Sequence, residues 1–211
     1  MTTTFKHDFT MMFVIHDALR RELELLAKTT ARTTDDPRRL VAAAAGWEMF
    51  KQYLHVHHGA EDDALWPQVR EALAERPADL AVVEAMEAEH ATIDPLLDGV
   101  DAVLADPARA AELGDLVDAL VTGLTGHFKH EEEAALPLID SVATPQLLQG
   151  FGQAHTVRIG EGTPRYLPWL LDGTGPQNTE AILGILPPPV RGLYNDVWVP
   201  AYRKLERWPA S

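Results

Sequence analysis

Two histidine–glutamate pairs in this sequence have the same spacing. His57 and Glu61 are four residues apart, and so are His127 and Glu131. On a helix, residues four apart lie on one face, one turn from each other, so both side chains of a pair can bind one metal ion. Imidazole nitrogen and carboxylate oxygen together suit iron, manganese or zinc. The two pairs therefore predict a metal site that draws on two helices.

A lone histidine precedes each pair at a similar distance. His16 lies 41 residues before His57, and His90 lies 37 residues before His127. Taken alone, a histidine on the apolar face of a helix is usually a hydrogen-bonded core residue, and one such pair is as often a surface pair as a ligand pair. The duplicated pattern favours metal binding, because it describes two helical hairpins that each supply a histidine and a histidine–glutamate pair.

Each glutamate of the two pairs is also followed by a proline. Pro67 comes six residues after Glu61, and Pro137 comes six residues after Glu131. Proline has no backbone N–H, and its ring clashes with the preceding helical turn. We therefore expect a kink or break in the helix at both positions.

Four long helices are needed to position these side chains. The apolar residues follow helical periodicity over residues 5–31, about 37–75, 77–104 and 107–140. Pro37, directly after a capping residue, suits the start of the second helix, and Pro95 is expected to disturb the third. Elements of this length with short connections favour an antiparallel up-down four-helix bundle, so the predicted fold class is all-α.

The composition limits the kinds of metal site and partner. The chain has 211 residues, of which 46% are apolar, so a sizeable core can form. It has no cysteine, which leaves nitrogen and oxygen as metal ligands. The net charge of −14 argues against nucleic acid or an anionic membrane as a general partner. With no signal-peptide pattern and no apolar run near the length of a membrane span, we expect a cytoplasmic protein.

The composition changes near residue 140. Residues 1–140 contain 27 acidic and 12 basic residues, a net charge of −15, whereas residues 141–211 contain 5 acidic and 6 basic residues. The second part also holds 9 of the 15 prolines and 3 of the 5 tryptophans. Its aromatic side chains need burial. We therefore predict a bundle domain at 1–140, and at 141–211 a partly helical, Pro-rich C-terminal extension packed on it.

The combined pattern resembles the hemerythrin-like cation-binding domain, in the subgroup with one histidine on the first and third helices that is familiar among actinobacteria. The resemblance covers about residues 5–140. The residues that carry it are His16, His57-x-x-x-Glu61, His90 and His127-x-x-x-Glu131. It implies a non-haem centre of two iron ions, bridged by both glutamates and an oxo or hydroxo group. Oxygen binding, iron handling and reactions with peroxide or nitric oxide all occur in the wider family.

The sequence departs from the oxygen carriers of that family. They have a further histidine on the third helix, four residues from its partner, whereas Met86 and Asp94 stand four residues from His90 here. Methionine is a poor ligand for ferric iron, and Asp94 precedes Pro95. The last carboxylate also follows its histidine by four residues where the carriers have five. These differences argue against reversible oxygen carriage.

The remaining set of predicted ligands favours catalysis over reversible oxygen binding. Four histidines and two carboxylates across two metals average two histidines and one carboxylate per metal, as in non-haem iron sites with open positions. We predict a peroxidase-type oxidoreductase that acts on hydrogen peroxide, nitric oxide or both, with an electron donor that the sequence does not identify. An oxygen- or iron-binding sensor or storage protein without turnover, and a metal-free helical interaction module, are the alternatives. Manganese or zinc would also suit these ligands.

Further side chains lie close to the predicted ligands in sequence. Tyr53 is one turn before His57, so its phenol could act as a ligand, proton donor or radical relay; we predict a catalytic role, with a core aromatic as the alternative. His58 should point about 100° away from its neighbour, which makes it, like Asp94, a less favoured extra ligand. His155 is expected to be solvated or near an opening.

Overall fold

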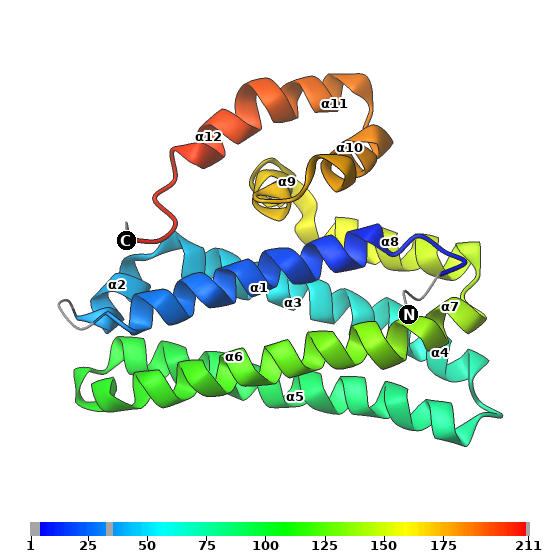
Figure 1. Cartoon of the computed structure of the whole chain (residues 1–211), viewed down its shortest axis with the longest axis horizontal. Coiled ribbons are helices and arrows are strands. Elements are labelled where there is room, and N and C mark those ends of the chain that lie inside the picture. The colour runs from blue at the N-terminus through cyan, green and yellow to red at the C-terminus, as the bar shows by residue number, and fades with distance from the viewer. Residues whose placement is uncertain (1–4, 33–35, 210–211) are drawn as a thin grey trace.

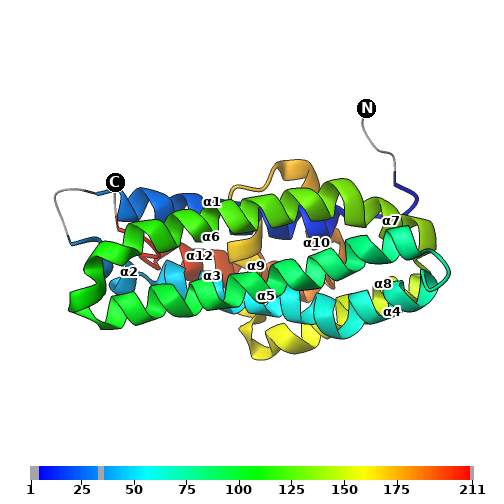
Figure 2. The ribbon, with the colours of Figure 1, turned by 90° about the horizontal axis from the view of Figure 1, so that it is seen from below.

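The structure is a computed structural model that describes residues 5–32 and 36–209, and within those residues it is helical, without a strand. Four helical rods run side by side in alternating directions (Figures 1 and 2). The first rod is α1 (Thr10–Thr30), and the third is α5 (Pro77–Ala105). The second rod consists of α2 (Pro37–Ala43), α3 (Ala45–Ala60), the π-helix η1 (Glu61–Leu65) and α4 (Trp66–Ala72). The fourth rod consists of the 3₁₀-helix η2 (Pro107–Glu112), α6 (Leu113–His130), the π-helix η3 (Glu131–Ala135) and α7 (Leu136–Val142). The predicted all-α bundle is confirmed.

The first helix begins later than predicted, at Thr10 instead of residue 5. The backbone N–H groups of Lys6 and His7 donate to the carboxylate of Asp140, each at 2.9 Å, which ties this segment to α7. Asp8 then accepts a hydrogen bond from the N–H of Thr10, the first residue of the helix, at 2.8 Å. These contacts hold residues 5–9 in an irregular conformation where periodicity alone predicts helix.

The second rod breaks earlier than the predicted kink at Pro67. Asp36 caps α2 through the N–H of Arg38, as the sequence predicts, but Ala44 is extended, with φ −81° and ψ 113°, and separates α2 from α3. At Pro67 the rod continues, because α4 begins there with the proline in its first turn. Likewise, α5 runs unbroken through Pro95.

A π-helical turn, η1, accommodates Pro67. The N–H of Trp66 bonds back five residues to the carbonyl of Glu61, instead of the four residues of an α-helix. The wider turn keeps the rod continuous where the missing N–H and the ring of proline would otherwise break it. The turn begins at Glu61, one of the two predicted bridging residues.

The same arrangement recurs in the fourth rod. Leu136 donates its N–H to the carbonyl of Glu131, five residues back, and Pro137 follows directly. The expected kink at Pro137 is thus a π-turn that begins at the second predicted bridging glutamate. Isolated π-turns inside α-helices occur frequently at functional sites.

Two apolar clusters lie on either side of the predicted ligands. The larger one fills the α2 end of the bundle and includes Leu54 of α3 and Leu124 of α6. The smaller one lies at the α4 end and includes Leu65, Met86 and Leu136. Met86, one of the two residues found where the carriers have a histidine, is fully buried in this second cluster. The polar layer between the clusters comes from the segments around residues 16, 57–61, 90 and 127–131.

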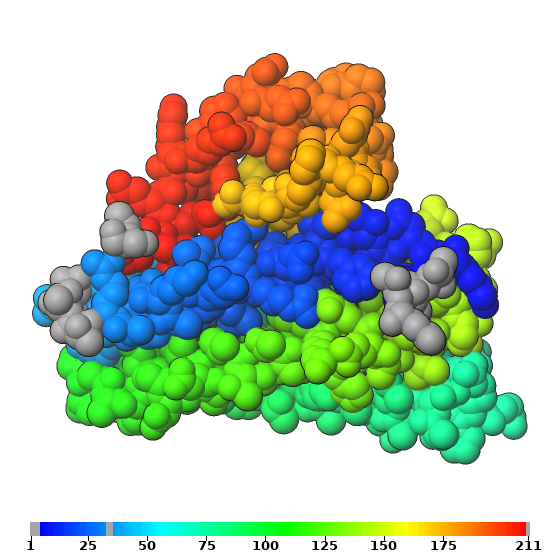
Figure 3. Space-filling view, viewed as in Figure 1, coloured from blue at the N-terminus to red at the C-terminus, as the bar shows by residue number. Residues whose placement is uncertain are grey.

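The C-terminal extension packs on the bundle, as predicted, and lies over α1 and α3 (Figures 1 and 3). Its elements are α8 (Pro145–Ile159), the 3₁₀-helix η4 (Gly160–Gly162), α9 (Thr163–Leu171), α10 (Pro176–Ile185), α11 (Pro188–Leu193), the π-helix η5 (Tyr194–Trp198) and α12 (Val199–Arg203). α8 follows α3 and η1, and α9 lies on α1. Within the described residues, no helix is both long and apolar enough to cross a bilayer.

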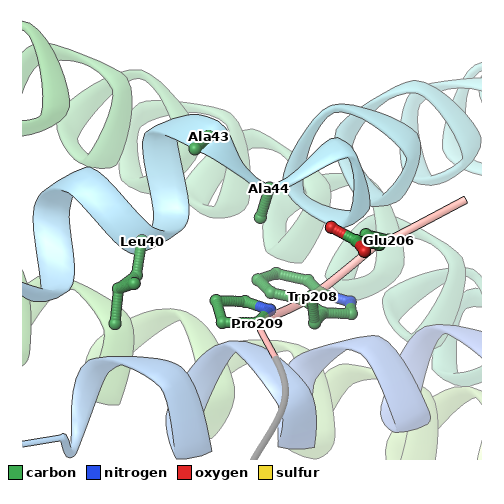
Figure 4. Close-up of a pocket in the computed structure, with 6 residues that line it drawn as sticks. All are labelled: Leu40, Ala43, Ala44, Glu206, Trp208 and Pro209. Carbon is green, nitrogen blue, oxygen red and sulfur yellow. The ribbon is translucent and has the colours of Figure 1, made fainter.

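The end of the extension is anchored on a buried carboxylate of α1. Glu22, which is fully buried, accepts hydrogen bonds from the guanidinium of Arg207 and the indole N–H of Trp208, both at 2.6 Å. Gly46 donates its N–H to the carbonyl of Arg207 at 2.8 Å, and a Cβ on Gly46 would lie 2.3 Å from the Trp208 indole. A shallow cleft of about 340 Å³ stays open beside this contact (Figure 4), lined by Leu40, Ala43, Ala44, Glu206, Trp208 and Pro209.

Candidate metal centre

Four buried side chains from three rods form a first group of possible metal ligands. His16 and His57 turn their Nε2 atoms toward each other at 3.0 Å, and His16 Nε2 lies 3.1 Å from Oε2 of Glu131. His57 Nε2 lies 3.5 Å from Oε1 of Glu61. The ligand atoms of all four lie within 4.8 Å of one another, and the four side chains are fully buried. We call these four residues the first group.

Three histidines form a second group beside it, with ligand atoms that also lie within 4.8 Å of one another. His90 and His127 turn their Nε2 atoms toward each other at 3.1 Å. The ring of His58 stacks on that of His90, with centroids 3.9 Å apart and planes 9° apart. We call His58, His90 and His127 the second group.

Both glutamates span the two groups. Oε1 of Glu61 faces His57 at 3.5 Å, while its Oε2 faces His90 of the second group at the same distance. Oε2 of Glu131 lies 3.1 Å from His16 and 4.0 Å from His127. Each carboxylate can therefore contribute to two metal positions.

Carboxylates outside the groups orient three of the histidines. His16 Nδ1 lies 2.8 Å from Oε1 of Glu132, His90 Nδ1 lies 2.8 Å from Oδ1 of Asp62, and His127 Nδ1 lies 2.9 Å from Oε2 of Glu89. Each carboxylate accepts the Nδ1 proton and so leaves the lone pair on Nε2, which faces the centre. Metal-binding histidines are oriented in this way in many proteins.

The pairing of His90 with His127 is itself evidence for a cation. Both Nδ1 atoms donate to carboxylates, so both Nε2 atoms carry lone pairs, and these face each other at 3.1 Å. Two acceptors this close repel unless a positive ion lies beside them both. Two nitrogens bound at about 2.1 Å and at right angles to one another would be about 3.0 Å apart, close to the separation found.

Several buried ligand atoms lack a hydrogen-bond partner among the described residues. They are Nδ1 of His57, Nε2 of His58 and both carboxylate oxygens of Glu61 and Glu131. The glutamate oxygens are close to histidine nitrogens but do not have hydrogen-bond geometry. Because a buried carboxylate without partners is strongly unfavourable, its presence here fits a site that binds metal ions.

The electrostatics give most of these side chains the protonation state that a metal needs. Burial lowers the pKa of His57 and His58 well below the usual value, so both imidazoles are neutral and can bind a metal. Burial, reinforced by Glu131, raises the pKa of Glu61 well above its usual range. Burial also acts to raise the pKa of Glu131, but His16 outweighs it, and the pKa is lowered. The pKa values of the two carboxylates are thus shifted in opposite directions, and protonation is more favourable at Glu61 than at Glu131.

The structure brings all six predicted ligands together. It also places His58 beside them, whereas the sequence predicts that this side chain points away from the centre. His58 is 5% exposed and packs against His90. His58 does diverge from His57, but it still reaches the site because α3 has a neighbour on two sides. His57 faces α1, and His58 faces the α5–α6 hairpin. Asp94, the other less favoured ligand, points to solvent, with its side chain 64% exposed and 3.5 Å from His55.

Tyr53 is fully within the core and faces the extension. Its ring centroid lies 4.5 Å from that of Trp169 and 5.0 Å from that of Tyr166, both on α9. Burial raises the pKa of Tyr53 to about 12, so its phenol is protonated near neutral pH. Ring contacts of 5.8 Å and 6.1 Å continue from Tyr166 through His155 to His57. The catalytic role of Tyr53 stays a prediction, and the structure places its ring against α9 within a series of rings that ends at His57.

His155 is buried, which corrects the expectation that it is solvated. It is 9% exposed, because α8 packs against α3 and η1. Burial, with a smaller effect from Arg158, lowers the pKa of His155 to about 4, so the ring is neutral near pH 7. Its Nε2 has no hydrogen-bond partner among the described residues. The sequence alone gives no sign of this burial, since it depends on where the extension docks.

An all-helical bundle with buried histidines and glutamates in this arrangement belongs to the class of cation-binding helical proteins. The chain is a member of the hemerythrin HHE cation-binding domain family, whose family model matches residues 7–139. Members of that family bind metal ions, typically iron, and the matched range includes both ligand groups. The extension lies outside it. Comparisons with curated proteins and with solved structures found no match.

Proposed function

We propose that this protein holds two iron ions and uses them to reduce hydrogen peroxide, with nitric oxide as a further substrate or co-substrate. The observation that carries the proposal is the position of Glu61 and Glu131, each of which faces histidines of both groups. Two separate mononuclear sites would not need carboxylates between them. Bound iron would supply the redox change, and the protein side chains would set the positions open to substrate.

The two groups differ in the number of histidines. The first group offers His16 and His57, whereas the second offers three imidazoles because His58 joins it. With the glutamates shared, the metal at the first group has fewer protein ligands. The exchangeable position for a small molecule is therefore on the side of His16 and His57, which is also the side covered by α8 and α9.

Peroxide reduction to two waters consumes two electrons and two protons. The electrons come from an external donor, and nitric oxide is one candidate for it. The carboxylates on the outer nitrogens connect the buried histidines to the surface. Glu89, for example, lies 2.9 Å from His127 and 2.7 Å from the half-exposed His130. Because His127 keeps its Nδ1 proton toward Glu89, this contact orients the ligand, and the two protons would reach the bound peroxide from solvent.

A binding protein without turnover is the second candidate, and His58 is the observation that favours it. With His58, five imidazoles can bind metal, one more than the sequence predicts. Fewer coordination positions then remain for a substrate. Rapid mixing of the ferrous and ferric protein with peroxide separates the two functions. Repeated turnover supports the enzyme, whereas one stable adduct per centre supports a sensor or store.

The metal content of the freshly purified protein tests the proposal directly. We expect close to two irons per chain, with the visible absorption of a coupled ferric pair. Glu131→Ala should lose at least one iron, and His58→Ala should lose iron from the second group. His55→Ala is the matched control, because His55 lies on the same helix with its side chain 56% exposed. Parent protein with negligible metal, or equal losses in the His55 and His58 variants, would contradict the proposal.

A further inference from the structure

A cavity of about 160 Å³ lies between α1 and α8. Its walls are mostly apolar and include Met12 and Ile15 of α1, Leu65 of η1 and Phe151 of α8. Two polar side chains also line it, Asp8 and His155, and Asp8 is exposed to solvent. We call this cavity the α1–α8 chamber.

The inner end of the chamber adjoins the first group. Ile15 directly precedes His16 in α1, and Leu65 closes the π-turn that begins at Glu61. The ring of His155 lies 6.1 Å from that of His57. The chamber therefore lies beside the segments that carry His16 and Glu61, with the ring of His155 between it and His57.

His155 supplies unused hydrogen-bonding capacity at this inner end. Its side chain is more than nine-tenths buried, it lines the chamber, and its Nε2 has no hydrogen-bond partner among the described residues. The other side chains near it are aromatic, with Phe151 at 6.3 Å and Tyr166 at 5.8 Å between ring centroids. A small molecule in the chamber would find its hydrogen bond here.

We propose that the α1–α8 chamber is the access route by which small uncharged molecules reach the first group, and that His155 holds them by a hydrogen bond before they pass to the metal. The inference rests on the proposed function, because it names the ligands that the centre receives. A dry apolar cavity of about 150 Å³ can hold a molecule as large as benzene, so nitric oxide, dioxygen and hydrogen peroxide fit with room to spare.

The walls and the nearby charge discriminate against anions. Moving an ion into an apolar cavity removes its hydration without replacing it. Hydrogen bonding to Thr10 lowers the pKa of Asp8, which keeps a negative charge on the lining. The bundle behind it carries the large acidic excess of residues 1–140. Azide, nitrite and superoxide are therefore expected to enter more slowly than neutral molecules of similar size.

Introducing a large side chain at the chamber wall tests the route. Gly152 lines the chamber at its solvent-exposed side, and a Cβ there meets nothing within 4 Å, so a large side chain has room to cover the mouth of the chamber. Gly150, on the same helix, meets only the amide of Gln68 at 3.9 Å and is not part of the lining. Gly152→Trp and Gly150→Trp thus make the same substitution with and without access to the chamber.

The readout is nitric oxide binding to the ferrous, fully loaded protein by stopped flow and flash photolysis. For Gly152→Trp we expect the association and dissociation rates both to fall by about tenfold or more, while Kd changes by less than about twofold. A plug in a route slows both directions equally, whereas damage at the metal changes Kd. Gly150→Trp should match the parent. An unchanged association rate in Gly152→Trp overturns the proposal.

A further measurement, xenon binding, separates the route from the metal chemistry. Crystals of the full chain under xenon pressure should show xenon in the chamber of the parent and none in Gly152→Trp, whatever metal is bound. Xenon in the chamber without any nitric oxide binding would refute the proposed function and leave the chamber intact. An empty chamber would refute the route.

Asp8→Asn tests the discrimination against anions. It retains an oxygen that accepts from the Thr10 N–H but loses the charge. We expect azide to bind the ferric protein several-fold faster in this variant, with the difference shrinking at high salt, while the rate for nitric oxide stays the same. Equal azide rates in variant and parent at low salt would overturn the claim of charge selectivity.

Discussion

Alanine substitution of Glu132, Glu89 or Asp62 is expected to weaken metal binding in that order. Each carboxylate holds the outer nitrogen of one buried histidine, at 2.8 to 2.9 Å. The side chains differ in exposure: 20% for Glu132, 33% for Glu89 and 43% for Asp62. The more exposed the carboxylate, the more readily water replaces it, so exposure sets the expected order.

The magnitude follows from the role of such carboxylates. Losing the outer partner of a metal-binding histidine typically reduces metal affinity by about 10- to 100-fold, or about 1.4 to 2.7 kcal/mol. Glu132 should reach the upper end, since it is the least exposed and also accepts from Arg20 at 2.8 Å. Asp62 should lie at or below the lower end, with Glu89 between them.

Competition with a chelator of known affinity measures these differences, with cobalt(II) or iron(II) as the ion. Glu87→Ala is the matched control, because Glu87 lies on α5 two residues from Glu89 but pairs with Arg70 rather than with a histidine. It should bind metal as the parent does. A loss in Glu87→Ala as large as in Glu89→Ala, or an Asp62 variant weaker than the Glu132 variant, would refute the reasoning.

Three other predictions concern separate features. Tyr53→Phe should keep both irons and most of the stability while changing the visible spectrum or the rate with peroxide; a loss of stability alone would make Tyr53 a core aromatic. Glu22→Ala should lower the free energy of unfolding in urea by about 3 kcal/mol, since it removes the buried acceptor of Arg207 and of the Trp208 indole N–H and leaves Arg207 paired with Asp172 alone. Glu24→Ala, at an exposed pair with Lys28, should change it by less than about 1 kcal/mol. Because burial raises the pKa of Glu61, metal binding should release protons and should strengthen as pH rises. Calorimetric titration in buffers of different ionisation enthalpy would show no buffer dependence if this is wrong.

The sequence predicts the histidines and glutamates of the centre because helical spacing alone places them. His57 and Glu61 share a helix face whatever the tertiary structure, and the repeat in the second hairpin doubles the evidence. The docking of the extension is different, because it depends on long-range contacts such as those of Glu22 with Arg207 and Trp208. The burial of His155 follows from that docking, so no local pattern could predict it.

The spacing of six residues from glutamate to proline predicts kinks, whereas the structure has π-turns at both places. Each begins six residues before a proline, and the extension shows the same spacing, since η5 begins at Tyr194 and Pro200 follows. In η5, too, the residue before the proline bonds back five residues, from Val199 to Tyr194. The third copy carries no predicted ligand. The spacing therefore indicates how a helix accommodates a proline. In this chain it coincides with a predicted ligand only where the π-turn begins at a glutamate.

The adjacent histidines of α3 explain how one helix serves two metal positions. Successive side chains on a helix diverge by about 100°, close to the angle between two neighbours of a helix in a square bundle. His57 thus meets His16 of α1, while His58 meets His90 of α5. Under the proposed function, this divergence suits a pair of metals between the hairpins, because three imidazoles gather in the second group and two in the first. The first group would then keep its open side toward His155 and the α1–α8 chamber.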